Sequence, residues 1–262
     1  MDGSFSELEI RGLFFIIFFF LFAGIEFTFP FRQFIHQRGR RWIQNFAIVF
    51  IDTVVVRVTL PFVAIDIALM AQEKHWGLFQ LISMPKWFVI LASVIFLDFA
   101  IYWQHRLFHR IPLLWKLHRM HHSDIMFDVS TALRFHPIEI FLSMLIKISL
   151  VIVLGIPAAA VIIFEILLSS SSLFNHMNVN LGKLDSLLRK ILVTPNMHRV
   201  HHSVVPQETD SNFGFCLSIW DQLFQTKVER PIAEQHDFLI GLYEFRDVTD
   251  NKISRLLSQP FL

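Results

Sequence analysis

The stretch YWQHRLFHRIPLLWKLHRMHHSDIMFDVSTALRFHPIE, residues 102–139, decides how the rest of the chain is organised. Two of its histidines, His105 and His109, stand four residues apart, and three more follow as His118, His121 and His122. On a helix, these spacings place the imidazoles of each cluster on one face, about one turn from each other. The stretch therefore predicts two helical segments, each with a face of histidines.

The same spacing recurs near the C-terminus, where His198, His201 and His202 repeat the pattern HxxHH, and His176 lies between the two regions. Nine histidines arranged in this way are too many and too regularly spaced for surface or packing roles, and we interpret them as a metal site. Since zinc takes about four ligands, nine imidazoles predict two ions. Three further histidines are isolated and are interpreted as ordinary residues: His36, His75 and His236.

Composition favours an integral membrane protein. Hydrophobic residues make up 54% of the 262 residues, and charged residues make up 17%, below the roughly 25% of soluble domains. The net charge of +1 argues against a nucleic-acid partner. The single cysteine, Cys216, excludes an intramolecular disulfide and a thiolate metal site, so any metal must be held by nitrogen and oxygen.

Long apolar runs predict an all-α fold with about three membrane-spanning helices, followed by a helical hairpin. The spans are expected at residues 13–31, at residues 45–71, and from Trp87 directly into the first histidine pair, since about 20 apolar residues cross a bilayer. Residues 138–174 form a second apolar block that is too long for one span. Gly155 and Pro157 are expected to break it into the hairpin.

The charges flanking the apolar runs predict the topology and the domains. The arginines of residues 32–44 indicate a cytoplasmic loop by the positive-inside rule. We therefore expect an external N-terminus and a cytoplasmic helical cap that carries the histidine-rich dimetal site. Three regions follow: an N-terminal transmembrane region (1–97), a catalytic domain (98–226) and a C-terminal extension (227–262).

Two divalent ions held by neutral imidazoles would need carboxylates nearby to compensate their charge. Asp98 is the strongest candidate, because it lies inside an apolar run two helical turns before His105. His136, in the motif RFHP, is either a further ligand or a group outside the ligand shell beside Arg134. We predict Asp98, His136 and Glu139 as catalytic residues. The other acids near the histidines are either further charge-compensating carboxylates or ordinary solvated loop residues and helix caps: Asp124, Asp128, Asp210 and Asp221.

The chain resembles the membrane-bound fatty acid hydroxylase and sterol desaturase superfamily in several stretches: DFAIYWQHRLFHRIPLLWKLHRMHHSD, ALRFHPIE, LFNHMNVN, TPNMHRVHHS and DSNFGFCLSIWDQLFQT. The resemblance implies a non-haem di-iron centre on the cytoplasmic membrane face, in the plasma or inner membrane or the endoplasmic reticulum. It also implies O2-dependent hydroxylation or desaturation of a lipid, with electrons from a separate donor. The ligands implied are His105, His109, His118, His121, His122, His176, His198, His201 and His202.

One position departs from the family pattern. Some hydroxylases of the superfamily have a second histidine four residues after the one that matches His176, and here that position is Asn180. A tenth ligand therefore stays open between Asn180 and His136. The RFHP motif is more similar to the sterol desaturase branch, which covers sterol, carotenoid, sphingoid and ether-lipid chemistry. No stretch resembles a fused cytochrome b5-like haem domain, so we expect a separate electron donor.

The expected cofactors are two iron ions with O2 as co-substrate, because redox-inert zinc cannot oxidise an unactivated C–H bond. Zinc competes for nitrogen ligands and is an expected contaminant of overexpressed protein. We predict lipid hydroxylation as the reaction, with lipid desaturation as the alternative. A metal transporter is the rival from another class, but it would need polar residues along several spans. A scaffold with a decayed site is disfavoured, because none of the nine ligand positions is missing.

Overall fold

The computed structural model describes residues 6–33, 38–232 and 239–262. Within these ranges the chain is helical, and its β pairing is limited to two isolated bridges. The predicted all-α fold is confirmed. In chain order the helices are α1 (Glu7–Thr28), α2 (Arg38–Thr59), α3 (Ala64–Glu73), α4 (Leu78–Leu81), α5 (Lys86–Arg110), α6 (Pro112–His122), η1 (Val129–Leu133), α7 (Pro137–Leu154), α8 (Ala158–Asn175), α9 (Lys183–Leu188), α10 (Pro195–His201), α11 (Pro206–Thr209), α12 (Ile219–Leu223), η2 (Val248–Asn251), α13 (Ile253–Ser258) and η3 (Gln259–Phe261).

Five segments in the described part of the chain are long and apolar enough to cross a membrane. They are α1, the segment Arg38–Leu81 that begins with α2, α5, α7 and α8. These segments correspond to the three predicted spans and the two halves of the predicted hairpin, and the chain is an integral membrane protein. The side of the membrane on which each end lies stays a prediction, as does the division at residues 97 and 226.

Two helix starts differ from expectation. The capping box of Ser6 and Glu9 begins α1 at Glu7, earlier than the apolar run alone indicated, because reciprocal side-chain bonds satisfy its first backbone N–H groups. The prediction of a loop over 32–44 is wrong for residues 38–44, which form the first two turns of α2. Of the isolated histidines, His75 lies in the turn between α3 and α4, whereas His36 and His236 lie outside the described residues.

The hairpin of α7 and α8 turns where Gly155 and Pro157 predict it. Gly155 is left-handed with φ +67°, and a Cβ there would lie 2.4 Å from the carbonyl oxygen of Trp76. A Cβ on Gly77, which has φ +91°, would lie 2.0 Å from the backbone nitrogen of Gly155. The hairpin tip therefore contacts the segment between α3 and α4 backbone to backbone, and only glycine permits this approach.

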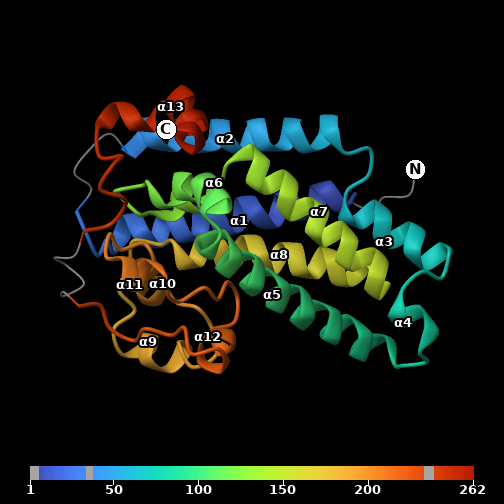
Figure 1. Cartoon of the computed structure of the whole chain (residues 1–262). Helices are drawn as coiled ribbons and strands as arrows, with labels where there is room; N and C mark the ends of the chain where they lie inside the picture. The colour runs from blue at the N-terminus through green and yellow to red at the C-terminus, as the bar shows by residue number, and fades with distance from the viewer. Residues whose placement is uncertain (1–5, 34–37, 233–238) are drawn as a thin grey trace.

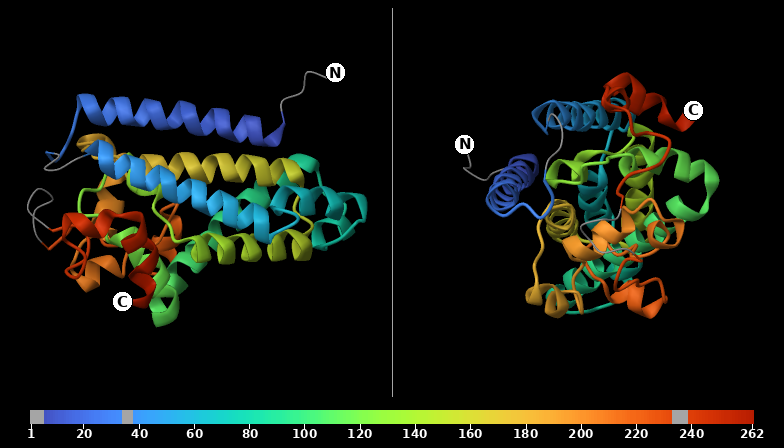
Figure 2. Two further views of the ribbon diagram at one scale, coloured as in Figure 1. Left: turned by 90° about the horizontal axis from the view of Figure 1, so that it is seen from above. Right: turned by 90° about the vertical axis from the view of Figure 1, so that its left-hand side faces the viewer.

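The long helices lie side by side and leave their histidine-bearing ends together. Helix α1 packs on α8, α2 and α3 pack on α7, and α5 packs on both α8 and α6. The short helices α9 to α12 gather at one end of this bundle, and α3 and α4 lie at the opposite end (Figure 1). Seen from above, α1 lies along the outside of the bundle beside α8 (Figure 2). The histidines are thus placed where the spans meet the short helices.

An internal ion pair attaches the segment between α6 and α7 to α2. The guanidinium of Arg41 lies 3.0 Å from Asp124 and 2.5 Å from Asp128, and all three side chains are buried. Burial raises the pKa of Asp124, but Arg41 and Arg134 outweigh this effect and hold that pKa below its usual value. Asn45 adds a hydrogen bond to Ser130 at 2.9 Å. Two of the acids that the sequence marked as site candidates, Asp124 and Asp128, therefore support the fold around the site.

Candidate metal centre

The nine histidines lie at the C-terminal ends of α5, α6 and α8 and on the short helix α10. His105 and His109 occupy the last two turns of α5, which continues without a break from the apolar span, as predicted. Pro112 at the first position of α6 stops α5 and starts a new helix in a different direction, since proline fits the first turn but not the interior of a helix. His176 caps the C-terminal end of α8. The last cluster lies on α10 and its C-cap, behind the N-cap Thr194.

The nine histidines separate into two groups whose ligand atoms lie within 4.8 Å of one another in each group. All nine side chains are buried. The two HxxHH motifs share their members between the groups in a reciprocal way: each contributes its outer pair to one group and its central histidine to the other. The first group is His105, His109, His118, His122 and His201, and the second is His121, His176, His198 and His202.

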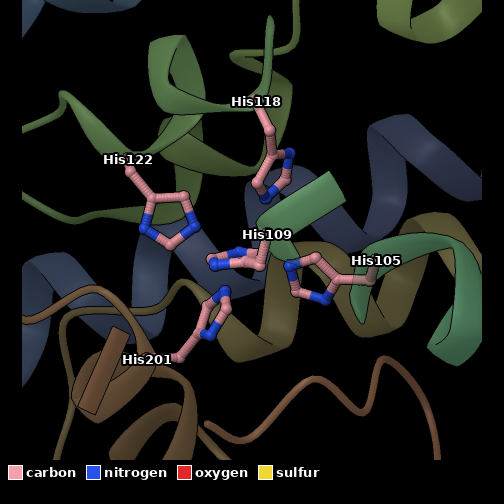
Figure 3. A group of neighbouring side chains, drawn as sticks. All are labelled: His105, His109, His118, His122 and His201. Carbon is pink, nitrogen blue, oxygen red and sulfur yellow. The ribbon is translucent and has the colours of Figure 1, made fainter. Parts of the chain in front are cut away.

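The five rings of the first group turn toward one another around His109 (Figure 3). Three of them are oriented through Nδ1: His105 donates to the carbonyl oxygen of Phe213 at 2.9 Å, and His201 donates to that of Ser211 at 2.7 Å. His118 donates to the carboxylate of Glu139 at 2.7 Å. A protonated Nδ1 leaves Nε2 with its lone pair. In each of these three rings, Nε2 is buried and has no hydrogen-bond partner among the described residues.

In the second group, four ring nitrogens converge on one point. Nε2 of His176 lies 3.0 Å from that of His198, 3.2 Å from that of His121 and 3.3 Å from that of His202. His176 Nδ1 donates to the carbonyl oxygen of Ser172 at 2.7 Å, so its Nε2 is an acceptor. Four tetrahedral ligands at about 2.1 Å from one ion have nearly this spacing. The donor set and its geometry therefore fit a metal ion in each group.

Histidine binds a metal ion in its neutral form. Burial, together with neighbouring imidazoles, lowers the pKa values of His121, His122 and His202 well below the ordinary value. Burial also lowers the pKa of His176 to about 4 and that of His201 to about 3. Protons therefore do not compete for these nitrogens at neutral pH.

The three predicted catalytic residues differ in their place relative to the histidines. Glu139 contacts His118 directly, in the first turn of α7. His136 caps α7, where its Nδ1 accepts from the backbone N–H of Ile138 at 3.2 Å and its Nε2 lies 3.3 Å from the carbonyl oxygen of Leu257. Both nitrogens are engaged, and His136 belongs to neither histidine group.

Asp98 lies beside the backbone rather than beside a histidine. It accepts hydrogen bonds from the backbone N–H groups of Cys216 and Leu217 at 3.1 and 3.2 Å, and from the indole of Trp220 at 2.8 Å. Asp221 accepts from Phe213 and Gly214, both at 2.8 Å. The two carboxylates thus hold the segment 213–217 from both sides. They orient His105 indirectly, because the carbonyl oxygen of Phe213 accepts the hydrogen bond from His105 Nδ1.

The remaining candidates are placed as follows. Asp210 is the one other acid next to a histidine in the described residues, with its carboxylate 3.4 Å from Nδ1 of His109, and its side chain is 42% exposed. Asn180 is exposed and accepts from Gly182 at 2.9 Å and from Asn196 at 3.1 Å. Among the described residues, the two groups together hold nine histidines, and His136 belongs to neither.

Sequence reasoning missed the carbonyl groups of Ser172, Ser211 and Phe213 that orient three of the rings. No residue type signals a backbone acceptor, and only the quoted stretch DSNFGF marked two of these positions. It also missed two aromatic walls. Phe135 stacks on His121 with ring centroids 4.3 Å apart, and Trp115 lies 4.9 Å from His109 by the same measure.

A cavity of about 270 Å³ opens beside the first group. It lies between α5, α7 and α8 and reaches His105 and His118 at one end. Apolar walls come from Ile101, Phe108 and Phe135, among others. The metal site is therefore adjacent to space inside the bundle of apolar helices.

Comparison with known proteins finds several relatives, and three of them are described here. The chain is 33% identical to alkylglycerol monooxygenase of Xenopus tropicalis over 172 residues, which are 64% of this chain and 36% of that protein. It is 31% identical to the Homo sapiens alkylglycerol monooxygenase over 58% of this chain and 34% of that protein. It is 35% identical to the ornithine lipid hydroxylase OlsE of Rhizobium tropici over 58% of this chain and 46% of that protein. The matches thus span between a third and a half of these relatives. No solved structure matches the chain.

A family model supplies the broader assignment. The model described as fatty acid hydroxylase matches residues 88–226, just over half of the chain. This range holds all nine grouped histidines, Glu139, and the segment 213–217 that orients His105. The resemblance read from the histidine motifs is confirmed: the chain belongs to the fatty acid hydroxylase family.

Proposed function

We propose that the protein is an O2-dependent lipid hydroxylase with two iron ions, one held by each histidine group. The observation that carries this proposal is the division of nine buried imidazoles into two groups, the first of which lies beside a cavity among apolar helices. Imidazole ligands suit iron as well as zinc and copper. When bound, iron would supply the redox chemistry that an unactivated C–H bond requires and that zinc lacks.

The chain's own residues prepare this site. Donation from Nδ1 to fixed acceptors aims Nε2 of His105, His118 and His201 inward, and such outer partners also raise the basicity of the ligand. The carboxylate of Glu139 compensates part of the positive charge on the His118 side. Phe135 and Phe108 line the cavity beside the first group and exclude bulk water from the reacting carbon.

The class of substrate rests on the relatives and on the membrane helices. The named relatives are a monooxygenase of alkylglycerols and a hydroxylase of ornithine lipids. The cavity lies among the apolar helices α5, α7 and α8. A lipid in the bilayer therefore fits the site. We further propose that the site faces the cytoplasm and receives electrons from a separate donor protein, since the arginines near α2 and the basic residues of α6 follow the positive-inside rule.

The test is an isotope experiment on the purified, iron-loaded protein in lipid vesicles with a reductant. A hydroxylase incorporates one atom of labelled O2 into the product lipid, and a desaturase yields a lipid lighter by two hydrogens without label. Replacing His105 by alanine should abolish the product, whereas replacing the exposed His75 by alanine should not. A product that forms without O2, or that takes its oxygen from labelled water, would refute the oxygenase.

A further inference from the structure

The cavity beside the first histidine group has polar side chains among its apolar walls. Polar side chains follow it along its length: Gln104 on α5, Ser143 and Lys147 on α7, and Glu165 with Ser169 on α8. Arg11 of α1 lies at its edge. Along α7, eight residues separate Glu139 from Lys147, which is about 12 Å at the rise of an α-helix. The polar lining therefore extends well away from the metal ligands.

The end remote from the histidines holds a network of charges. Glu165 lies 2.6 Å from the ammonium of Lys147 and 2.8 Å from the guanidinium of Arg11. Arg11 also contacts Glu7 at 2.5 Å. Within α8, a helix apolar enough to span a bilayer, Glu165 is the eighth residue. Ionisable groups at such depth are costly and usually line a cavity that admits a polar ligand or water.

Two groups on the cavity wall have unused hydrogen-bonding capacity. The side-chain oxygen of Gln104 is buried without a partner among the described residues, while its amide nitrogen donates to Ser143 at 3.1 Å. Lys147 has three donor hydrogens and contacts one acceptor, Glu165, in the described part of the chain. An unpaired acceptor and a cationic donor in the lining of one cavity suit a ligand that offers both a donor and an acceptor.

We propose that this cavity binds the uncharged polar head of the lipid substrate, with Gln104 and Lys147 as the residues that select it. The hydroxyl or amide N–H of the head donates to the side-chain oxygen of Gln104, and an oxygen of the head accepts from Lys147. The proposal rests on the proposed function for the identity of the ligand as a substrate, and it adds the chemical class of that substrate and the residues that recognise it.

The charge balance favours an uncharged head over an anionic one. Glu165 and Glu7 already offset Lys147 and Arg11, so a ligand carboxylate would bring an uncompensated charge into an apolar bundle. The volume supports a head rather than a whole lipid. About 270 Å³ falls just below the roughly 300–1,000 Å³ of sites that enclose a complete drug-sized ligand, so the alkyl tail extends beyond the cavity.

The experiment measures binding rather than turnover, using the full-length protein in detergent under nitrogen and without reductant. Three probes share one chain: hexadecylglycerol with an uncharged polyol head, palmitate with an anionic head, and hexadecane with none. Native mass spectrometry reports the bound fraction of each probe. We expect hexadecylglycerol to bind the wild-type protein at least tenfold more tightly than either of the others.

Two variants test the assigned residues. Gln104→Leu should weaken binding of hexadecylglycerol about fivefold, as expected for one neutral hydrogen bond, and Lys147→Met about tenfold or more, because its hydrogen bond is charge-assisted. Neither variant should change the affinity for hexadecane. Exposed residues outside the cavity give the matched controls Gln207→Leu and Lys183→Met, which should bind like the wild type. Metal content and thermal melting, measured on every variant, identify any that has not folded.

The outcomes are distinct. Tighter binding of palmitate than of hexadecylglycerol would overturn the uncharged head, and equal binding of hexadecane would overturn recognition of any head. Unchanged affinity in both folded variants would remove Gln104 and Lys147 from the site. Because no O2 or reductant is present, these results do not depend on oxidation. Absence of oxygenase activity in the isotope experiment would refute the proposed function and leave the binding result in place.

Discussion

Replacement of Glu139 by glutamine should loosen one metal ion and leave the other in place. The carboxylate accepts a hydrogen bond of 2.7 Å from Nδ1 of His118, and His118 belongs to the first group only. Glutamine keeps an oxygen acceptor of the same shape but loses the charge. A charge-assisted hydrogen bond is about twice as strong as a neutral one, so the difference is about 1–1.5 kcal/mol.

That difference corresponds to about a tenfold weaker affinity of the first group for its ion, since about 1.4 kcal/mol is a factor of ten. Glu139→Leu removes the acceptor altogether, and its effect should approach a hundredfold, at the upper end of the range for outer partners of metal ligands. The second group has no contact with Glu139 in the described residues, and its ion should be retained in both variants.

The assay is stepwise removal of metal by a chelator, with metal per chain measured by mass spectrometry. The wild type should lose its ions at high chelator concentration. Both variants should lose their first ion at a lower chelator concentration than the wild type, and the leucine variant at a lower concentration than the glutamine variant. Their second ion should be lost at the same chelator concentration as in the wild type. The matched control is Glu73→Gln, at the exposed C-terminal end of α3. Loss of both ions together in the variants, or an unchanged first step, would refute the assignment of Glu139 to one group.

Three further predictions concern the ligands and the topology. His201 and His202 are neighbours in sequence but belong to different groups, so His201→Ala and His202→Ala should each lose a different ion in the same chelator titration. Loss of the same ion from both variants would contradict the division. His136→Ala should keep the metal content of the wild type and lower the unfolding free energy by about 1 kcal/mol, measured by denaturant, because this residue caps α7; loss of an ion would make it a ligand. Cysteines at the exposed positions Lys74 and Ser254 should react with an impermeant thiol reagent in intact cells only at position 74, and labelling at position 254 would reverse the predicted topology.

Much of the fold is local in origin and could be predicted from the sequence. Apolar length predicts the spans, because about 20 residues must satisfy their own backbone hydrogen bonds within the bilayer. Gly155 and Pro157 end and restart a helix for reasons confined to their own backbone. The histidine spacings on α5, α6 and α10 place rings on common helix faces whatever those helices later contact. The metal site and its nine candidate ligands follow from these local facts.

The position of Asp98 shows what local reasoning leaves undecided. It lies seven residues before His105, which predicts a shared helix face and a carboxylate near the metal site. The structure fills that face with the segment 213–217, whose backbone N–H groups and the nearby Trp220 take the carboxylate. Helical periodicity states which way a side chain points, but the partner that arrives there comes from more than a hundred residues away.

The division of the histidines was likewise decided by tertiary structure alone. In both HxxHH motifs the sequence determines that the first and last histidines share a helix face with the central one close beside them. His121 joins one group and its neighbour His122 the other only because α6 and α10 bring their histidine rings together, with the end of α5 adding rings to one group and the end of α8 a ring to the other. The rings are then oriented by carbonyl groups of Ser172, Ser211 and Phe213. Every residue has a carbonyl group, so its use as an acceptor depends on packing and leaves no mark in the sequence.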